Sequence, residues 1–210
     1  MDKRAIEALG EALEGSDRPL LVTSGLALPV QGRAVTEDDP PIPVSSTYPR
    51  ASEATAAALI ARGVHASVVR LPQVHDPVKQ GLVTAVIRIY REKGVCAYVG
   101  DGLNRWAAAH VLDVAHLYRL ALEKAEPGAK YHAVAEEGVP LRDIAETIGR
   151  HLQLPVKSIA PEEAQDFFGW FGMFAGLDGP ASSAQTRSKL GWKPVGPTLL
   201  ADLDKGQYAA

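Results

Sequence analysis

The sequence has little of several features that mark particular classes of protein. A single cysteine, Cys96, occurs in 210 residues, so no disulfide can form within the chain and a reducing, cytoplasmic environment is expected. No stretch approaches the roughly 20 apolar residues that cross a bilayer, which predicts no membrane association. The 22 basic and 25 acidic residues are interspersed, and this pattern predicts no nucleic-acid surface.

Groupings of metal-ligating side chains are lacking as well. No set of His, Cys, Asp and Glu has the spacing of a zinc site, so no metal is expected. Cys96 lies in an apolar run, which predicts a small buried residue rather than a nucleophile. The N-terminal segment 1–15 is charged and amphipathic, and this pattern indicates a surface helix rather than a secretory signal.

The order of the apolar residues, which make up 46% of the chain, predicts an α/β fold. Continuous apolar runs at 18–28 and 65–72 are typical of strands that are covered on both faces of a parallel sheet. The alanine-rich segment 50–62 between them has high helix propensity. Together the three segments predict a right-handed strand–helix–strand crossover.

Further helices and strands are expected in alternation along the rest of the chain. They include a strand at 130–137 and a helix at 114–124 that Asp113 would cap. His75 and His110 have no carboxylate at a spacing that would define a dyad, so structural roles are expected for both.

A long loop is predicted at 29–49, because five prolines and the acidic cluster Glu37 to Asp39 suit no regular element. Loops of this length inside a compact domain are usually functional or mobile. Segment 167–174 concentrates six large apolar side chains. One interpretation is packing in a core or lobe; the other is an apolar wall that faces a substrate or a second copy.

Four motifs, in the same order along the chain, carry a resemblance to a known family. They are VTSG at 22–25, VVRLP at 68–72, YVGDGLNRWAAAHVLDVA at 98–115 and LGWKP at 190–194. In combination they resemble the extended short-chain dehydrogenases/reductases, the NAD-dependent epimerase/dehydratase family. The resemblance covers almost the whole chain and corresponds to the C-terminal two-thirds of the family's fold.

The resemblance implies an incomplete Rossmann-like parallel sheet with helices on its faces and a small C-terminal α/β substrate lobe. Residues 1–210 would form one truncated domain, with 77–94 and 138–200 mostly in the lobe. NAD or NADP is the implied cofactor, a small molecule is the implied substrate, and a homodimer is one option for assembly.

The sequence departs from the family pattern in three respects. No glycine-rich fingerprint for a pyrophosphate follows a strand near the start. The family's Tyr-x-x-x-Lys pair is not intact, since Ser45 and Pro49 stand at its two positions. The front of the family's sheet has no counterpart, so an edge would be exposed unless a partner covers it. Truncation, a cofactor half on another polypeptide and loss of dinucleotide binding are the three explanations.

The resemblance and the residue chemistry select a candidate site. Catalytic candidates are Ser24, at a strand end, and Tyr48, in the proline-rich loop; a turn role for Ser24 and a packing role for Tyr48 are the alternatives. Arg70 would clamp an anion or form an ordinary ion pair. The other candidates are Asn104, Arg105 and Trp106 for the substrate and Thr23 and Pro72 for the cofactor.

Two functions from different classes are compatible with these residues. The first is an NAD(P)-dependent oxidoreductase or epimerase that acts on a small carbonyl, hydroxyl or sugar-like compound. The second is a non-catalytic remnant that keeps the scaffold as a binding or association module, because a fold does not establish a reaction.

Overall fold

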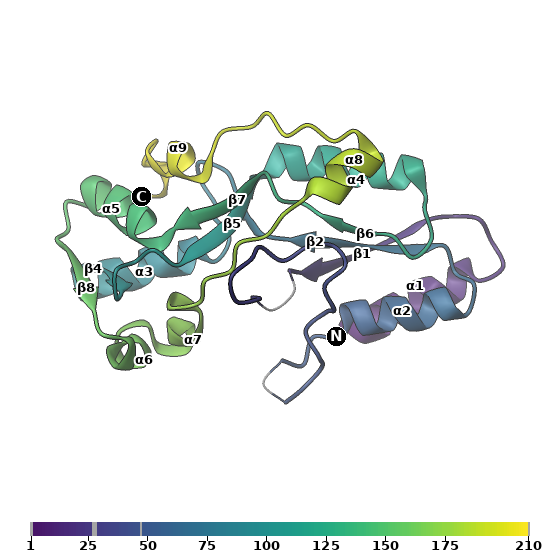
Figure 1. Cartoon of the computed structure of the whole chain (residues 1–210), viewed down its shortest axis with the longest axis horizontal. Helices are drawn as coiled ribbons and strands as arrows, with labels where there is room; N and C mark the ends of the chain where they lie inside the picture. The colour runs from purple at the N-terminus through teal and green to yellow at the C-terminus, as the bar shows by residue number, and fades with distance from the viewer. Residues whose placement is uncertain (1, 27–28, 47, 210) are drawn as a thin grey trace.

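A computed structural model describes residues 2–26, 29–46 and 48–209 (Figure 1). The chain forms a parallel sheet with helices on both faces, and a second group of strands and helices lies beside it (Figure 1). The predicted α/β class with a parallel sheet is confirmed. Positions 27 and 28, the end of the first predicted strand, lie outside the described residues.

The main sheet contains three parallel strands in the order β1-β2-β6. They are β1 (Leu20–Gly25), β2 (Ala66–Leu71) and β6 (Lys130–His132). The register pairs Leu20 with Ala66 and Val68 with Lys130. Because all three strands are parallel, their carboxyl ends lie at one edge of the sheet.

Helices cover both faces of this sheet. Helices α1 (Asp2–Leu13) and α2 (Ser52–Ala61) pack on one face, against the side chains of Leu20 and Val22. Helix α4 (Val111–Lys124) packs on the opposite face, near Leu21. The continuous apolar run of β1 follows from this double coverage, because side chains alternate between faces and both faces are apolar.

The second group of elements forms a lobe with its own core. Its strands make two sheets, β3-β5-β7 and β4-β8. These strands are β3 (Gln73–His75), β4 (Cys96–Val99), β5 (Arg105–His110), β7 (Glu136–Pro140) and β8 (Val156–Ile159). The helices of the lobe are α3 (Val83–Lys93), α5 (Leu141–Leu152), α6 (Ala164–Phe168), α7 (Gly172–Ala175) and α9 (Leu199–Leu203). Helix α8 (Ala184–Leu190) packs on α4 and β6 and so belongs with the main sheet. Single 3-10 turns occur at Pro161–Glu163, Gly169–Phe171 and Gln207–Ala209.

The aromatic cluster of segment 167–174 contributes to the core of the lobe. Phe168 and Phe171 are buried, and Phe171 packs edge-to-face on Trp106 with 5.4 Å between ring centroids. Trp170 and Met173 lie on the surface, 55% and 60% exposed. The packing interpretation therefore describes the buried part of the cluster, and the exposed Trp170 packs edge-to-face on Phe171 with 5.5 Å between ring centroids.

Three details differ from or agree with the sequence-based expectations. The predicted strand 130–137 is wrong as one element, because the chain leaves the main sheet after β6 and enters the lobe sheet as β7. Helix α4 begins at Val111 and is capped by His110, which accepts from the Leu112 N–H, so the predicted cap Asp113 is also wrong. Cys96 is buried as predicted, and burial raises the pKa of its thiol to about 11.

The proline-rich segment is a loop, as predicted, with isolated bridges and no full strand or helix in its described residues. One bridge pairs Val35 with Ala181 and so ties the loop to the C-terminal segment. Among the helices of the described ranges, none is both long and apolar enough to cross a bilayer.

Candidate functional site

The candidate site lies at the carboxyl end of β1, where parallel α/β sheets usually bind ligands. Ser24 and Gly25 end this strand, and the proline-rich loop leaves from there and returns to α2. The loop and the strand end enclose a pocket of about 90 Å³. Its lining residues are Ser24, Gly25, Pro41, Ile42, Pro43, Val44, Tyr48, Arg50, Glu53 and Ala54.

The pocket brings together the two residues that the sequence nominated as catalytic. Ser24 comes from β1 and Tyr48 from the end of the loop, and both residues line this pocket. A methyl group at Gly25 would lie 3.8 Å from the Tyr48 hydroxyl, so the phenol reaches the strand end closely. Among the described residues, neither the Ser24 nor the Tyr48 hydroxyl has a hydrogen-bond partner, and both are available to a ligand.

A turn before α2 holds Tyr48 in place. The Tyr48 N–H donates to Ser45 Oγ at 3.0 Å, and the Ser45 N–H donates to the Tyr48 carbonyl at 3.0 Å. Further back, Arg33 and Asp39 form a bidentate ion pair that lowers the pKa of the Asp39 carboxyl well below its usual range. These contacts order a segment that has no sheet or helix ladder of its own.

A second anchor joins the loop to helix α8. Glu37 Oε1 accepts from the Thr186 N–H at 2.8 Å and from the Thr186 hydroxyl at 2.6 Å. The same hydroxyl accepts from the His132 N–H at 2.8 Å. Through Thr186, the part of the loop at Glu37 is therefore tied to the carboxyl end of β6.

Glu53, which lines the pocket, forms a buried ion pair with Arg70. Arg70, which is 0% exposed, donates to Glu53 Oε1 at 2.6 Å and to Oε2 at 3.1 Å. Its Nη1 lies 3.3 Å from His132 Nε2. Because a guanidinium only donates, Nε2 must accept, and Nδ1–H donates to the Ser182 carbonyl at 2.8 Å. Burial lowers the pKa of His132, which agrees with a neutral imidazole.

This geometry bears on the role expected for Arg70. Of the two alternatives, anion clamp or ion pair, the structure places Arg70 in an ion pair with Glu53. To bind a substrate anion, the guanidinium would have to leave a buried carboxylate, which costs several kcal/mol. Its substrate-binding role stays a prediction that the observed contacts do not support.

The remaining candidates lie outside this pocket. Asn104 Nδ2 donates to two carbonyls, of Ala175 and Leu177, and Arg105 pairs with Asp178 at 2.8 Å. Trp106 is buried in the core of the lobe, where it packs on Phe171. It does not lie beside the Arg105 guanidinium in a way that would let the two side chains bind one substrate group together. Their role in substrate binding stays a prediction.

Neither cofactor candidate lines the pocket. The Thr23 hydroxyl is 2.7 Å from the Tyr118 hydroxyl on the face of the sheet that α4 covers. Pro72 lies between β2 and β3, next to the strand ends. Their predicted role therefore rests on the resemblance alone.

One cluster of titratable groups was missed by the sequence-based expectation. His75 and His110 are register partners on β3 and β5, and Asp202 of α9 lies against both. The distances to Asp202 Oδ2 are 2.8 Å from His75 Nδ1 and 3.6 Å from His110 Nε2. The expectation that these histidines have no carboxylate partner was wrong, because Asp202 lies 127 residues after His75 and no local spacing signals it.

This cluster is closed to a substrate. Asp202 is 0% exposed and His75 is 1% exposed. The second carboxylate oxygen of Asp202 accepts a hydrogen bond from Lys205 Nζ at 2.8 Å. The arrangement holds α9 over the strand ends of the lobe.

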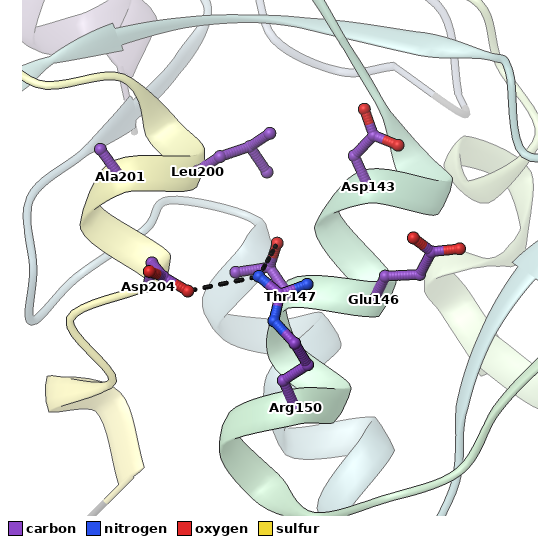
Figure 2. A pocket seen from close by; sticks show the side chains of 7 residues that line it. All are labelled: Asp143, Glu146, Thr147, Arg150, Leu200, Ala201 and Asp204. Carbon is purple, nitrogen blue, oxygen red and sulfur yellow. Dashed lines mark hydrogen bonds and ion pairs between the residues drawn. The ribbon is translucent and has the colours of Figure 1, made fainter.

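A larger groove of about 420 Å³ lies between α5 and α9 (Figure 2). Figure 2 shows Arg150 of α5 directed toward Asp204, and its Nη2 lies 3.3 Å from both the Thr147 hydroxyl and the Asp204 carboxylate. Asp143 and Glu146 project from the same helix. The groove is shallow and polar, its carboxylates face water, and it lies far along the chain from the β1 strand end. Size alone therefore does not select it as the site.

A dinucleotide cofactor needs a site for its pyrophosphate. A pyrophosphate binds at a glycine-rich turn between a strand and the N-terminus of a helix. Within residues 2–26, 29–46 and 48–209 no strand is followed by such a turn; Gly100 and Gly102 follow β4 but lead into β5. The described residues thus do not form a pyrophosphate site by themselves.

Residues 4–135 match the profile of the NAD dependent epimerase/dehydratase family. The chain is 44% identical over 214 residues to the protein C2A9.02 of Schizosaccharomyces pombe, covering 99% of this chain and 71% of that protein. It is 41% identical over 205 residues to the protein YLL056C of Saccharomyces cerevisiae, covering 97% of this chain and 68% of that protein.

The fold also resembles a solved dehydratase. The dTDP-glucose 4,6-dehydratase DesIV of Streptomyces venezuelae, with NAD and TYD bound, superposes with a TM-score of 0.73 at 16% identity. The match covers 99% of this chain and 63% of the dehydratase, so the chain spans less than two thirds of that protein's length. This likeness shows a shared fold.

Proposed function

Because this chain belongs to the NAD-dependent epimerase/dehydratase family, we propose that it forms the substrate side of an oxidoreductase or epimerase of that type. The substrate class is a small carbonyl, hydroxyl or sugar-like compound. The observation that carries the proposal is the meeting of Ser24 and Tyr48, with free hydroxyls, in one pocket at the carboxyl end of β1.

The pocket residues suit a hydrogen-bonded substrate oxygen. Ser24 would donate a hydrogen bond to this oxygen, and the Tyr48 phenol would exchange a proton with it. Arg50, the cation among the lining residues, would stabilise negative charge that develops there. The pocket, of about 90 Å³, is small beside the roughly 300–1,000 Å³ of a site that encloses a whole ligand, so it would admit the reacting group and leave the rest of the substrate outside.

The cofactor enters this proposal only as a partner of the family's chemistry. NAD or NADP, when bound, would accept or supply the hydride. Since the described residues do not form a pyrophosphate site, they would bind the dinucleotide only weakly, and the part of the fold that holds its pyrophosphate would lie outside them. No step of the pocket residues depends on where that part is located.

Ligand binding and turnover test the proposal directly. NADH and NADPH, at millimolar concentration because no glycine-rich turn grips the pyrophosphate, are added with a generic aldehyde or ketone. Binding is followed by the fluorescence of the three tryptophans and by the melting midpoint, which a ligand specific for the folded state raises. We expect turnover that Ser24→Ala and Tyr48→Phe each reduce by 10²-fold or more.

The matched control is Ser46→Ala, which changes an exposed serine of the same loop that does not line the pocket. A midpoint and a fluorescence signal that no cofactor or carbonyl compound changes would reject the enzyme proposal for this chain. The non-catalytic alternative, favoured by Ser45 and Pro49 at the positions of the family's Tyr-x-x-x-Lys pair, would then stand.

A further inference from the structure

The residues that line the pocket at the end of β1 fall into a polar and an apolar group. The polar group includes Ser24, Tyr48 and Arg50, whose side chains all carry hydrogen-bond donors. Ser24 is 8% exposed, and neither its hydroxyl nor that of Tyr48 has a partner among the described residues. A few donors in a small pocket suit one acceptor oxygen of a ligand and fix its orientation.

The apolar group comes mainly from the proline-rich loop. Residues 41–44, with the sequence PIPV, line the pocket together, and Ala54 of α2 lies with them. Pro41 and Pro43 have no backbone N–H, so this part of the lining is poor in donors as well as apolar. A ligand group on this side of the pocket would therefore have to be apolar itself.

Contacts on both sides of residues 41–44 hold this apolar wall in place. Before it, Glu37 accepts from the N–H and the hydroxyl of Thr186. After it, Ser45 and Tyr48 exchange two hydrogen bonds in a turn. The proline rings also fix two φ angles within the wall. The wall is thus built by the protein's own contacts and does not depend on a ligand.

The pocket offers little to the hydroxyl groups of a ligand. Among the lining residues that the structure describes, the one carboxylate is that of Glu53, and its two oxygens already accept from Arg70 at 2.6 Å and 3.1 Å. The Ser24 and Tyr48 hydroxyls are engaged as donors once a substrate oxygen is bound. A further ligand hydroxyl would lose its hydrogen bonds to water without a side-chain partner in return, which is unfavourable.

We infer that the pocket selects a carbonyl compound whose reacting carbon carries apolar groups, an aliphatic aldehyde or ketone or the corresponding alcohol, over polyhydroxylated compounds such as sugars. The substrate oxygen accepts from Ser24 and Tyr48, and the apolar substituent lies against Ile42 and Val44. The inference rests on the proposed function, because it takes the two hydroxyls as the place of the reacting oxygen, and it narrows the substrate class to apolar members.

Two ketones of the same shape test this selection. Diethyl ketone and dihydroxyacetone share one skeleton, but dihydroxyacetone carries hydroxyls where diethyl ketone has its terminal methyl groups. Each is titrated into the isotope-labelled full chain without cofactor, and binding is followed by the NMR shifts of the Ser24, Gly25 and Ala54 amides. We expect diethyl ketone to bind at least ~tenfold more tightly, since an apolar pocket discriminates against one added hydroxyl by roughly 10²-fold.

A substitution in the wall tests the cause of the preference. Val44→Thr exchanges a methyl group for a hydroxyl at similar volume, and Val44 is 51% exposed, so the fold should tolerate the change. We expect the preference for diethyl ketone to fall by ~threefold or more, because the new hydroxyl is a partner for a ligand hydroxyl. The matched control Val195→Thr makes the same exchange at an 88% exposed valine outside the pocket and should leave the preference unchanged.

Equal or tighter binding of dihydroxyacetone would overturn the inference, and so would unchanged shifts of all three amides with both ketones. A preference in Val44→Thr equal to that in Val195→Thr would show that the wall does not set it, with the same consequence. The proposed function can fail separately. A preference for diethyl ketone without turnover in the presence of NADH or NADPH would reject the enzyme and support the selection, and turnover of both ketones at equal rates would reject the selection alone.

Discussion

Two places where parallel strands end differ in what covers them. At the end of β1, a proline-rich loop leaves a pocket in which the Ser24 and Tyr48 hydroxyls are free. At the ends of β3 and β5, the short helix α9 inserts Asp202 between two histidines and closes the space. The same strand-end geometry thus produces a candidate site in one region and a structural cluster in the other, and the covering segment decides which.

The comparison predicts that the buried ion pair of Arg70 and Glu53 contributes to stability rather than to ligand binding. Arg70→Met should have the largest effect of the variants considered. The substitution leaves the Glu53 carboxylate buried without its cation, so we expect the free energy of unfolding to fall by about 3–5 kcal/mol. Urea unfolding measures it. The control Arg62→Met breaks a solvent-exposed pair with Glu14 and should lower the free energy of unfolding far less. Equal losses for the two arginines would contradict the buried-pair assignment.

The next effect concerns the closed cluster. Asp202→Ala removes the acceptor of His75 and the partner of Lys205, and we expect a loss of about 2–3 kcal/mol in the same measurement. Asp204→Ala, two residues later on the surface, should change the free energy of unfolding far less than Asp202→Ala does. If Asp202→Ala also abolished ligand binding without a loss of stability, the cluster would be part of the site and the comparison would fail.

A smaller effect should appear in the pH dependence of stability. Burial, opposed by the hydrogen bond to Asp202, lowers the pKa of His75 below its ordinary value of 6.5. The unfolded chain then takes up a proton at a higher pH than the folded chain, so stability is lost as the pH falls below about 6.5. His75→Asn, which keeps a donor toward Asp202, should flatten this part of the curve. His116→Gln, on the exposed side of α4, should leave the slope unchanged.

The smallest effect on stability is expected at the pocket itself. The hydroxyls of Ser24 and Tyr48 have no partner among the described residues, so Ser24→Ala and Tyr48→Phe should each change the free energy of unfolding by less than about 0.5 kcal/mol. A loss of 2 kcal/mol or more for either variant would show a structural hydroxyl and would remove the distinction between the two regions.

Much of the main sheet was predictable, and less of the site. The continuous apolar runs of β1 and β2 with the alanine-rich segment between them predicted the parallel crossover, because that pattern is local. The pair His75–Asp202 was not predictable, since its members are joined only by the packing of α9 on the lobe. The prediction of one strand at 130–137 was wrong for a similar reason. Its two halves pair with strands of different sheets, and a short stretch of sequence does not show which strands will pair.

The α/β class, the family, the long loop and the choice of Ser24 and Tyr48 as candidates followed from composition, short motifs and local periodicity. That the two hydroxyls share a pocket, and that Arg70 is paired with Glu53, became visible in the folded chain. The folded chain also shows that the outer side of β1 has no strand in the described residues. The physical reason is that burial and pairing depend on which distant segments come together in the folded chain, and local sequence does not specify those contacts.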